Sequence, residues 1–158
     1  MNCLIEGEVP FQLMLFGCRQ LQTSERRNGS FFCGDQLLIQ IGQRIATYIE
    51  KKGIFVARIG GDEFVIICPN RDDISSQTLA NQINSSLKKT FSIDGFELTT
   101  SAIIGISSFP QQGRDAEQVI NAADVAMYWA KKSGQEITRF KPSMSQGARK
   151  KTANLTRD

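Results

Sequence analysis

The sequence predicts an α/β domain of the α+β type, in which helices flank a mixed β-sheet. Three observations predict this fold class. Short apolar runs of strand length alternate with segments whose apolar residues recur every three or four positions. Glycine-containing turns join neighbouring apolar runs as tight hairpins. Helices that lie between strands are typical of a sheet covered by helices, and hairpins add antiparallel pairs to that sheet.

The first part of the chain predicts one strand and one helix. Residues 11–18 are a short apolar run and predict a buried strand. Residues 20–34 are polar and contain glycine, which predicts an irregular segment. Residues 35–52 predict a helix that Gly53 ends. Its recurring apolar positions are Leu38, Ile41, Ile45 and Ile49.

Residues 54–68 predict a β-hairpin with an acidic tip. Gly60 and Gly61 stand between two apolar runs, and glycine permits the positive φ of a tight turn. Without side chains, these positions also let a ligand approach the backbone closely. Asp62 and Glu63 follow directly, and paired carboxylates suit a hard cation or phosphate chemistry. For these four residues alone, an ordinary turn with solvated carboxylates is the alternative.

The next segments predict a helix, a second hairpin and a strand. The apolar positions of the helix are Leu79, Ile83 and Leu87. Ser75 or Ser76 is its expected N-cap. Residues 91–100 predict a hairpin that turns at residues 94–95, an Asp-Gly pair. Residues 101–109 predict a strand because apolar residues dominate its centre.

The last predicted elements are a helix and a short strand. Asp115 is the expected N-cap of the helix, with Gln118 as a possible capping-box partner. The helix ends near Gly134, and residues 136–140 predict the strand. The apolar face of the helix consists of Val119, Ala123, Met127 and Ala130.

The composition is that of an ordinary globular domain. A chain of 158 residues with 41% hydrophobic and 22% charged residues suits one domain with a real core. The net charge of +3 is too small to indicate nucleic acid as a partner. The four cysteines form no C-x-x-C pair and histidine is absent, so a zinc site is not expected. We expect reduced cysteines and a cytoplasmic location, and no membrane segment because no apolar run approaches ~18 residues.

Residues 57–64 read ARIGGDEF, and this run resembles the defining motif of the GGDEF family, the diguanylate cyclase domains of bacteria. Three further stretches are similar to family motifs in the right order and spacing. Residues 34–38 match the G-D-x-L-L helix entry, residues 101–110 the S-x-G strand, and residues 123–131 the A-D-x-A-x-Y-x-A-K helix. The resemblance therefore covers residues 34–140.

This resemblance implies a fold and an activity. The family fold is a mixed five-stranded sheet flanked by helices, related to nucleotide cyclases and polymerase palms, with the motif on a β-hairpin. Active members join two GTP molecules into cyclic di-GMP and pyrophosphate, and each half of a homodimer holds one GTP. Mg²⁺ or Mn²⁺ ions are the implied cofactors, and catalysis is mainly positioning and charge neutralisation.

The resemblance also implies site residues. Asp62 and Glu63 match the catalytic carboxylates, with Glu63 as metal ligand and Asp62 near the reacting hydroxyl and the metal. The implied GTP-binding residues are Gly60 and Gly61 against the nucleotide, Asp35 at the guanine edge and Lys131 at the phosphates. Asp35 could instead be only a helix N-cap, and Lys131 could be only a solvated helix end.

The chain departs from the family mostly upstream of the hairpin. Active members carry D-x-D-x-F-K-x-x-N at the end of the first strand, and its first Asp is a metal ligand. Here Gly17 and Arg19 replace the two aspartates, and Glu25 replaces the guanine-reading Asn. The second metal position thus loses its anchor, because Mg²⁺ needs several oxygen ligands. Gln135 replaces a phosphate-contacting Arg, and the product-inhibition motif R-x-x-D is absent before the hairpin.

The chain divides into three parts on this interpretation. We expect residues 1–10 to be an N-terminal extension, residues 11–141 to be the domain and residues 142–158 to be a linker or tail. The tail resembles the connector to a following EAL phosphodiesterase domain, so the chain could come from a GGDEF–EAL protein. A plain solvated or disordered end is the alternative.

Three functions remain open on the sequence. The first is a GTP-binding regulatory module whose catalysis is weakened or lost because the first-strand aspartates are missing. The second is an active diguanylate cyclase that recruits metal through Asp62, Glu63 and a backbone carbonyl. The third is a structural or dimerisation module, against which the intact acidic hairpin argues.

Overall fold

A computed structural model describes residues 1–19, 22–23, 32–50 and 53–145 of the chain. Glu25 and the tail beyond residue 145, about which the sequence raises expectations, lie outside these ranges. The helices and strands are α1 (Asn2–Glu6), β1 (Phe11–Cys18), β2 (Gln22–Thr23), α2 (Phe32–Ile49), β3 (Phe55–Gly60), β4 (Glu63–Pro69), α3 (Asp73–Leu87), β5 (Phe91–Ile93), β6 (Phe96–Thr99), β7 (Ala102–Phe109), α4 (Ala116–Ser133) and β8 (Ile137–Arg139).

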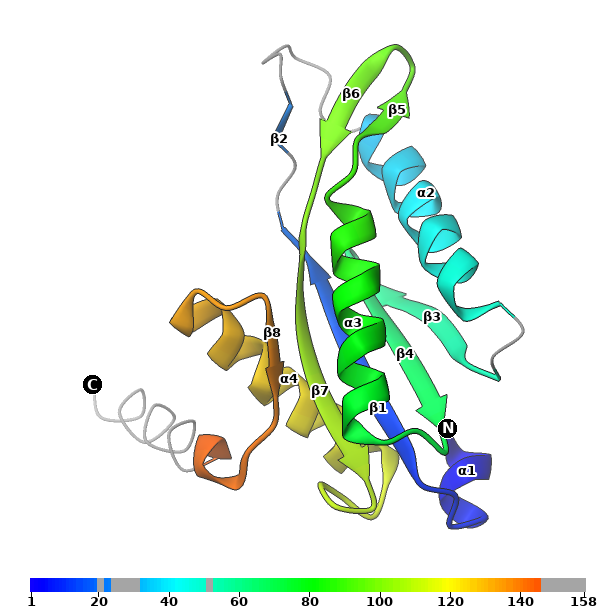
Figure 1. The fold of residues 1–158 in the computed structure, drawn as a ribbon, viewed down its shortest axis with the longest axis vertical. Helices are drawn as coiled ribbons and strands as arrows, with labels where there is room; N and C mark the ends of the chain where they lie inside the picture. Colours follow the sequence, from blue (N-terminus) through cyan, green and yellow to red (C-terminus); the bar gives the residue numbers. More distant parts are fainter. Residues whose placement is uncertain (20–21, 24–31, 51–52, 146–158) are drawn as a thin grey trace.

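A five-stranded sheet of order β3-β4-β1-β7-β8 forms the centre of the fold (Figure 1). Strand β1 is antiparallel to both β4 and β7, while β7 and β8 are parallel. This confirms the predicted mixed sheet flanked by helices. A second, three-stranded sheet of order β2-β6-β5 extends from one end of the first.

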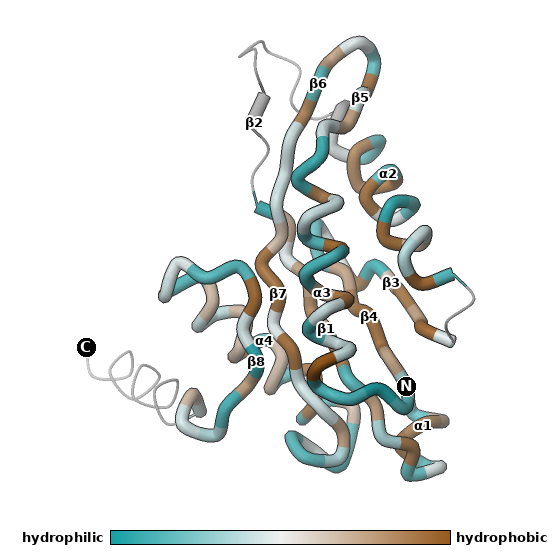
Figure 2. The backbone as a smooth tube through the Cα atoms, viewed as in Figure 1, coloured by the Kyte–Doolittle hydropathy of each residue, from teal (hydrophilic) through white to brown (hydrophobic). Residues whose placement is uncertain are grey.

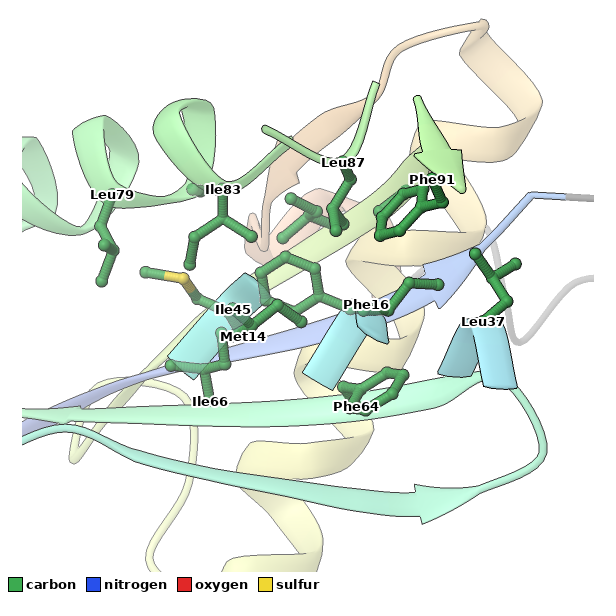
Figure 3. Close-up of a cluster of buried hydrophobic side chains, with 14 of the residues drawn as sticks. Met14, Phe16, Leu37, Ile45, Phe64, Ile66, Leu79, Ile83, Leu87 and Phe91 are labelled. Atoms are coloured by element: carbon green, nitrogen blue, oxygen red, sulfur yellow. The ribbon is translucent and has the colours of Figure 1, made fainter. Parts of the chain in front are cut away.

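Helices α2 and α3 cover one face of the central sheet. Their apolar stripes meet the side chains that β1, β4 and β7 direct to that face (Figure 3). The buried cluster includes Met14, Phe16, Leu37, Ile45, Phe64, Ile66, Leu79, Ile83, Leu87 and Phe91. In Figure 2, α3 alternates between hydrophobic and hydrophilic colours along its turns, as expected of a helix with one buried side.

Helix α4 covers the opposite face of the sheet. The second buried cluster contains Leu13 and Leu15 of β1, which alternate along the strand with the Met14 and Phe16 of the first cluster. Helix α1, which lies in the segment expected to be an extension, packs Leu4 and Ile5 against this second cluster. Within the described ranges, none of the helices combines the length and apolar character needed to cross a bilayer.

Several element predictions are confirmed closely. Strand β1 has the predicted bounds. The second predicted hairpin is present as β5 and β6, and its turn residues Asp94 and Gly95 have φ of 49° and 83°. Asp115 caps α4 by accepting a bond of 2.8 Å from the Gln118 backbone N–H. Gly134 ends α4 in the left-handed conformation, with φ of 72°.

Two helix starts differ from the prediction. Helix α2 begins at Phe32, so Asp35 lies within the first helical turn and is not the N-cap. Helix α3 is capped by Asp72, whose Oδ1 accepts from the Ser75 N–H at 2.7 Å, and not by Ser75 or Ser76. The Asp72 carboxylate binds a free N–H group of the first helical turn, so the helix already begins at Asp73. Ser75 and Ser76 therefore lie inside the helix, and Ser76 is fully buried.

The last strand, β8, is fastened to α3 at both of its ends. At its start, Glu136 Oε2 accepts from Lys88 Nζ at 2.7 Å and from Asn84 Nδ2 at 2.9 Å. At its end, Arg139 donates to Ser76 Oγ at 2.8 Å and to Gln12 Oε1 at 2.6 Å. Burial lowers the pKa of Arg139, and the Asp73 carboxylate, 3.1 Å away, opposes that effect.

We expect Gly105→Ala to lower the free energy of unfolding by about 3 kcal/mol. An alanine Cβ would overlap the Ala123 carbonyl oxygen and lie 2.6 Å from Met127 N, so α4 would have to move away from β7. Gly34→Ala is the matched control, because its Cβ meets nothing within 4 Å and alanine favours a helix. Urea unfolding followed by Trp129 fluorescence measures both. Equal midpoints for the two variants would contradict the close approach.

Candidate functional site

The acidic hairpin turns tightly at Gly61 and Asp62. Gly61 has φ of 47°, a value that glycine adopts without strain. Arg58 Nε donates to the Gly61 carbonyl at 2.8 Å across the turn. The pairing of β3 with β4 is irregular between Arg58 and Gly60, which marks a bulge beside the turn. The tip is therefore braced from within the hairpin, and Arg58 acts there as a bracing residue.

The central strand lies directly beside the hairpin carboxylates. Gly17 of β1 is the antiparallel partner of Glu63 at the start of β4. The next residue, Cys18, donates its backbone N–H to the Asp62 carbonyl at 3.2 Å. Position 17 is thus the nearest strand position from which a side chain could join Glu63 in holding a ligand.

An apolar side chain of α4 lies over position 17. A Cβ built on Gly17 would lie 3.2 Å from the Met127 Sδ, which is tighter than an ordinary van der Waals contact. Met127 itself is 3% exposed and belongs to the second buried cluster. Position 17, which the resemblance matches to a metal-binding aspartate, therefore offers no side-chain oxygen here and faces a thioether.

Cys18 does not compensate for the missing oxygen. Burial raises the pKa of its thiol to about 11, and the charge of Asp62 acts in the same direction. The thiol is therefore neutral near pH 7, whereas the thiolate is the form that binds metals.

An open cleft of about 840 Å³ lies between the hairpin and α4. Its lining residues are Leu15, Ile59, Glu63, Asp115, Glu117, Gln118, Ile120, Asn121 and Asp124. Asp124 thus shares the cleft with Glu63, although the sequence indicated it only as part of a helix motif. Helix α4 brings the two carboxylates to one cleft from positions far apart in the chain, and no local pattern reveals such a pair.

The other candidate residues lie at the same end of the sheet but on different elements. Asp35 is exposed in the first turn of α2, whose Leu37 packs beside Phe16 and Phe64 near the ends of β1 and β4 (Figure 3). Lys131 is exposed in the last turn of α4, one turn beyond Met127. Lys131 also fits a solvated helix end, because a cation near a helix C-terminus is favourable.

A two-cation site does not fit the residues at this end of the sheet. Asp62 and Glu63 supply carboxylates, but Gly17 supplies none and the Cys18 thiol is protonated. In the part of the chain that the structure describes, no group of three or more His, Cys, Asp or Glu residues could hold a metal ion. Mg²⁺ requires near-octahedral oxygen coordination, which two neighbouring carboxylates do not provide for two ions.

We expect Gly17→Ala to lower the free energy of unfolding by about 1 kcal/mol, since its Cβ would crowd the Met127 thioether. In a Met127→Ala background the same change should cost less, because the crowding atom is gone. Gly60→Ala is the control, as nothing lies within 4 Å of its added Cβ. Urea unfolding of the four-variant cycle provides the measurement. An equal cost of Gly17→Ala in both backgrounds would show that Met127 does not occupy this space.

Curated relatives of the chain are larger signalling proteins. The chain is 36% identical over 114 residues to "Cyclic di-GMP phosphodiesterase PdeR" of Escherichia coli (strain K12). The aligned residues make up 72% of this chain and 17% of that protein. It is 34% identical over 116 residues to "Bifunctional diguanylate cyclase/cyclic di-GMP phosphodiesterase MucR" of Pseudomonas aeruginosa. Here the aligned residues make up 73% of this chain and 17% of that protein. The chain thus spans less than two thirds of these relatives.

Solved structures share the fold. The GGDEF domain of PA1120 (YfiN or TpbB) from Pseudomonas aeruginosa superposes with a TM-score of 0.75 at 24% identity, over 89% of this chain and 88% of that one. An EAL/GGDEF domain protein from M. capsulatus superposes with a TM-score of 0.69 at 32% identity, over 84% and 86% of the two chains.

The family model described as "Diguanylate cyclase, GGDEF domain" matches residues 4–137. That match includes the acidic hairpin, the strands β1, β3, β4 and β7 of the central sheet, and all of α4. The chain therefore belongs to the GGDEF family and is a GGDEF domain of cyclic di-GMP signalling.

Proposed function

We propose that this GGDEF domain is a GTP-binding regulatory module whose catalysis is weakened or lost. The observation that carries the proposal is the pairing of Gly17 with Glu63, beneath the Met127 thioether. A carboxylate at position 17 would complete a cation site with Glu63, and a glycine cannot. The hairpin keeps its acidic tip, so the loss concerns cation binding rather than the whole site.

The proposed GTP site uses the residues that the family motifs imply. Gly60 and Gly61 leave the backbone bare, and no heavy atom lies within 4 Å of a Cβ built on either glycine. Asp35 and Lys131 are both exposed, as contacts to a guanine edge and to phosphates require. Neither residue forms a salt bridge with any residue that the structure describes. Both side chains are therefore available to a nucleotide.

The phosphate contacts are also reduced at Gln135. Its backbone N–H donates to the Ala130 carbonyl at 3.0 Å, and its side-chain oxygen accepts from Thr138 Oγ1 at 3.1 Å. The Gln135 side chain therefore already bonds to Thr138 of β8. A neutral amide also lacks the charge and the forked donors with which arginine binds phosphate.

Asp62 and Glu63 remain the residues that would act on GTP if the domain turns it over. An active diguanylate cyclase, which would join two GTP across a homodimer with Mg²⁺ or Mn²⁺, is the second candidate. The intact hairpin favours it, as does the likeness to "Diguanylate cyclase DgcP" of Escherichia coli, 32% identical over 104 residues. A structural or dimerisation module is the third candidate, and the intact acidic hairpin, with Asp62 exposed and Glu63 half-buried, argues against it.

The names of two relatives support a proposal about the biological setting. MucR is named as a bifunctional cyclase and phosphodiesterase, and the M. capsulatus protein is named for both EAL and GGDEF domains. We therefore propose that the domain works in the cytoplasm beside an EAL domain, whose phosphodiesterase activity it adjusts when GTP is bound.

The full chain, incubated with GTP and Mg²⁺ or Mn²⁺, is expected to form no cyclic di-GMP above the enzyme-free background. Chromatography of the nucleotides provides the measurement, and Glu63→Ala is the control. Product that accumulates with the unaltered chain and disappears in Glu63→Ala would establish the active cyclase instead.

Calorimetry with a non-hydrolysable GTP analogue tests binding. Lys131→Gln is expected to weaken the affinity about tenfold, or about 1.4 kcal/mol, since it removes a charge-assisted phosphate contact. Lys132→Gln is the matched control, because it removes the same charge from the neighbouring position, where Nζ lies 5.3 Å from the Trp129 ring centroid. No binding heat from the unaltered chain would support the structural module.

A further inference from the structure

Arg19 has a fixed backbone although it lies just beyond β1. Its N–H donates to the Ser101 carbonyl at 2.8 Å. Its own carbonyl accepts a bond of 3.0 Å from Oγ1 of Thr100, a buried residue. Both partners belong to the connection between β6 and β7. The position of Arg19 relative to the central sheet is therefore set by two hydrogen bonds.

Arg19 follows directly on the contacts that join β1 to the acidic tip. Gly17 pairs with Glu63, and Cys18 donates to the Asp62 carbonyl. Position 19 is two residues beyond Gly17, the spacing at which an extended chain returns to the same face. The Arg19 side chain is exposed and forms no ion pair with any residue that the structure describes.

The Arg19 charge matters for an anionic ligand because the neighbouring Asp62 and Glu63 are also negatively charged. A triphosphate beside Asp62 and Glu63 is repelled unless positive charge lies between them. The residues at this end do not fit the two cations that supply that charge in active members of the family. The guanidinium on the hairpin itself, that of Arg58, donates from Nε to the Gly61 carbonyl. Arg19, Lys131 and Lys132 remain as exposed cations at this end of the described structure, and the Lys132 Nζ lies 5.3 Å from the Trp129 ring centroid.

We propose that the Arg19 guanidinium takes the place of the missing cation, so that the site binds a nucleoside triphosphate without divalent metal. The planar guanidinium presents forked donors that match phosphate oxygens and keeps its charge at any physiological pH. This inference rests on the proposed GTP binding. It adds that binding is insensitive to chelation of metal and depends on residue 19.

Titration calorimetry of the full chain with the non-hydrolysable GTP analogue, in EDTA and in Mg²⁺, tests the inference. The affinities in the two buffers are expected to agree within about threefold, because the positive charge is built into the chain. Arg19→Gln is expected to weaken binding in EDTA about tenfold, the loss of one charge-assisted contact. Arg114→Gln removes the same charge from an exposed position at the start of α4 and is the matched control.

The outcomes separate this inference from the proposed function. Binding that is tenfold or more tighter in Mg²⁺ than in EDTA would overturn the replacement of the cation while leaving GTP binding intact. An unchanged affinity in Arg19→Gln, or an equal loss in Arg114→Gln, would also overturn it. Absence of binding in both buffers would overturn the GTP-binding module itself, and this inference with it.

Discussion

The pairing of β1 with its two neighbours is the constraint on which the rest of the structure depends. This strand is hydrogen-bonded to β4 on one side and to β7 on the other along its whole length. Its alternate residues enter two different buried clusters, with Phe16 in one and Leu15 in the other. A shift of register by one residue would exchange both sets between the two faces, so the register is fixed from both sides. Gly17 consequently cannot move away from Glu63, and the chemistry of the hairpin is decided by what position 17 offers.

Much of this fold could be predicted because the signals are local. Strand β1 is buried on both faces, so its apolar run has the same bounds as the strand. The two hairpins are marked by glycines that adopt positive φ, Gly61 and Gly95. The N-cap of α3 differs from the prediction because several residues of capping type lie close together in residues 72–76. Only the geometry selects Asp72 over Ser75 or Ser76. The pairing of β2 with β6 was also missed, since a two-residue polar strand has no periodicity to detect.

In the candidate site, too, features with a local sequence signal could be predicted, and features set by contacts between distant residues could not. The acidic hairpin is a continuous stretch of chain, and the sequence therefore indicates it directly. The thioether over Gly17 and the cleft that Asp124 shares with Glu63 arise from contacts between residues far apart in the sequence. The departures at positions 17 and 19 could be recognised from the resemblance alone. Their physical meaning required the register of β1 against β4 and the packing of α4.

The attachment of β8 has a mechanical consequence. This strand is the last element of the domain before residue 140, and side chains at both of its ends are tied to α3, through Glu136 at one end and Arg139 at the other. A tether at both ends of a short segment resists rotation as well as displacement. A rotation of the chain beyond β8 would therefore move α3 and the sheet together as one rigid body.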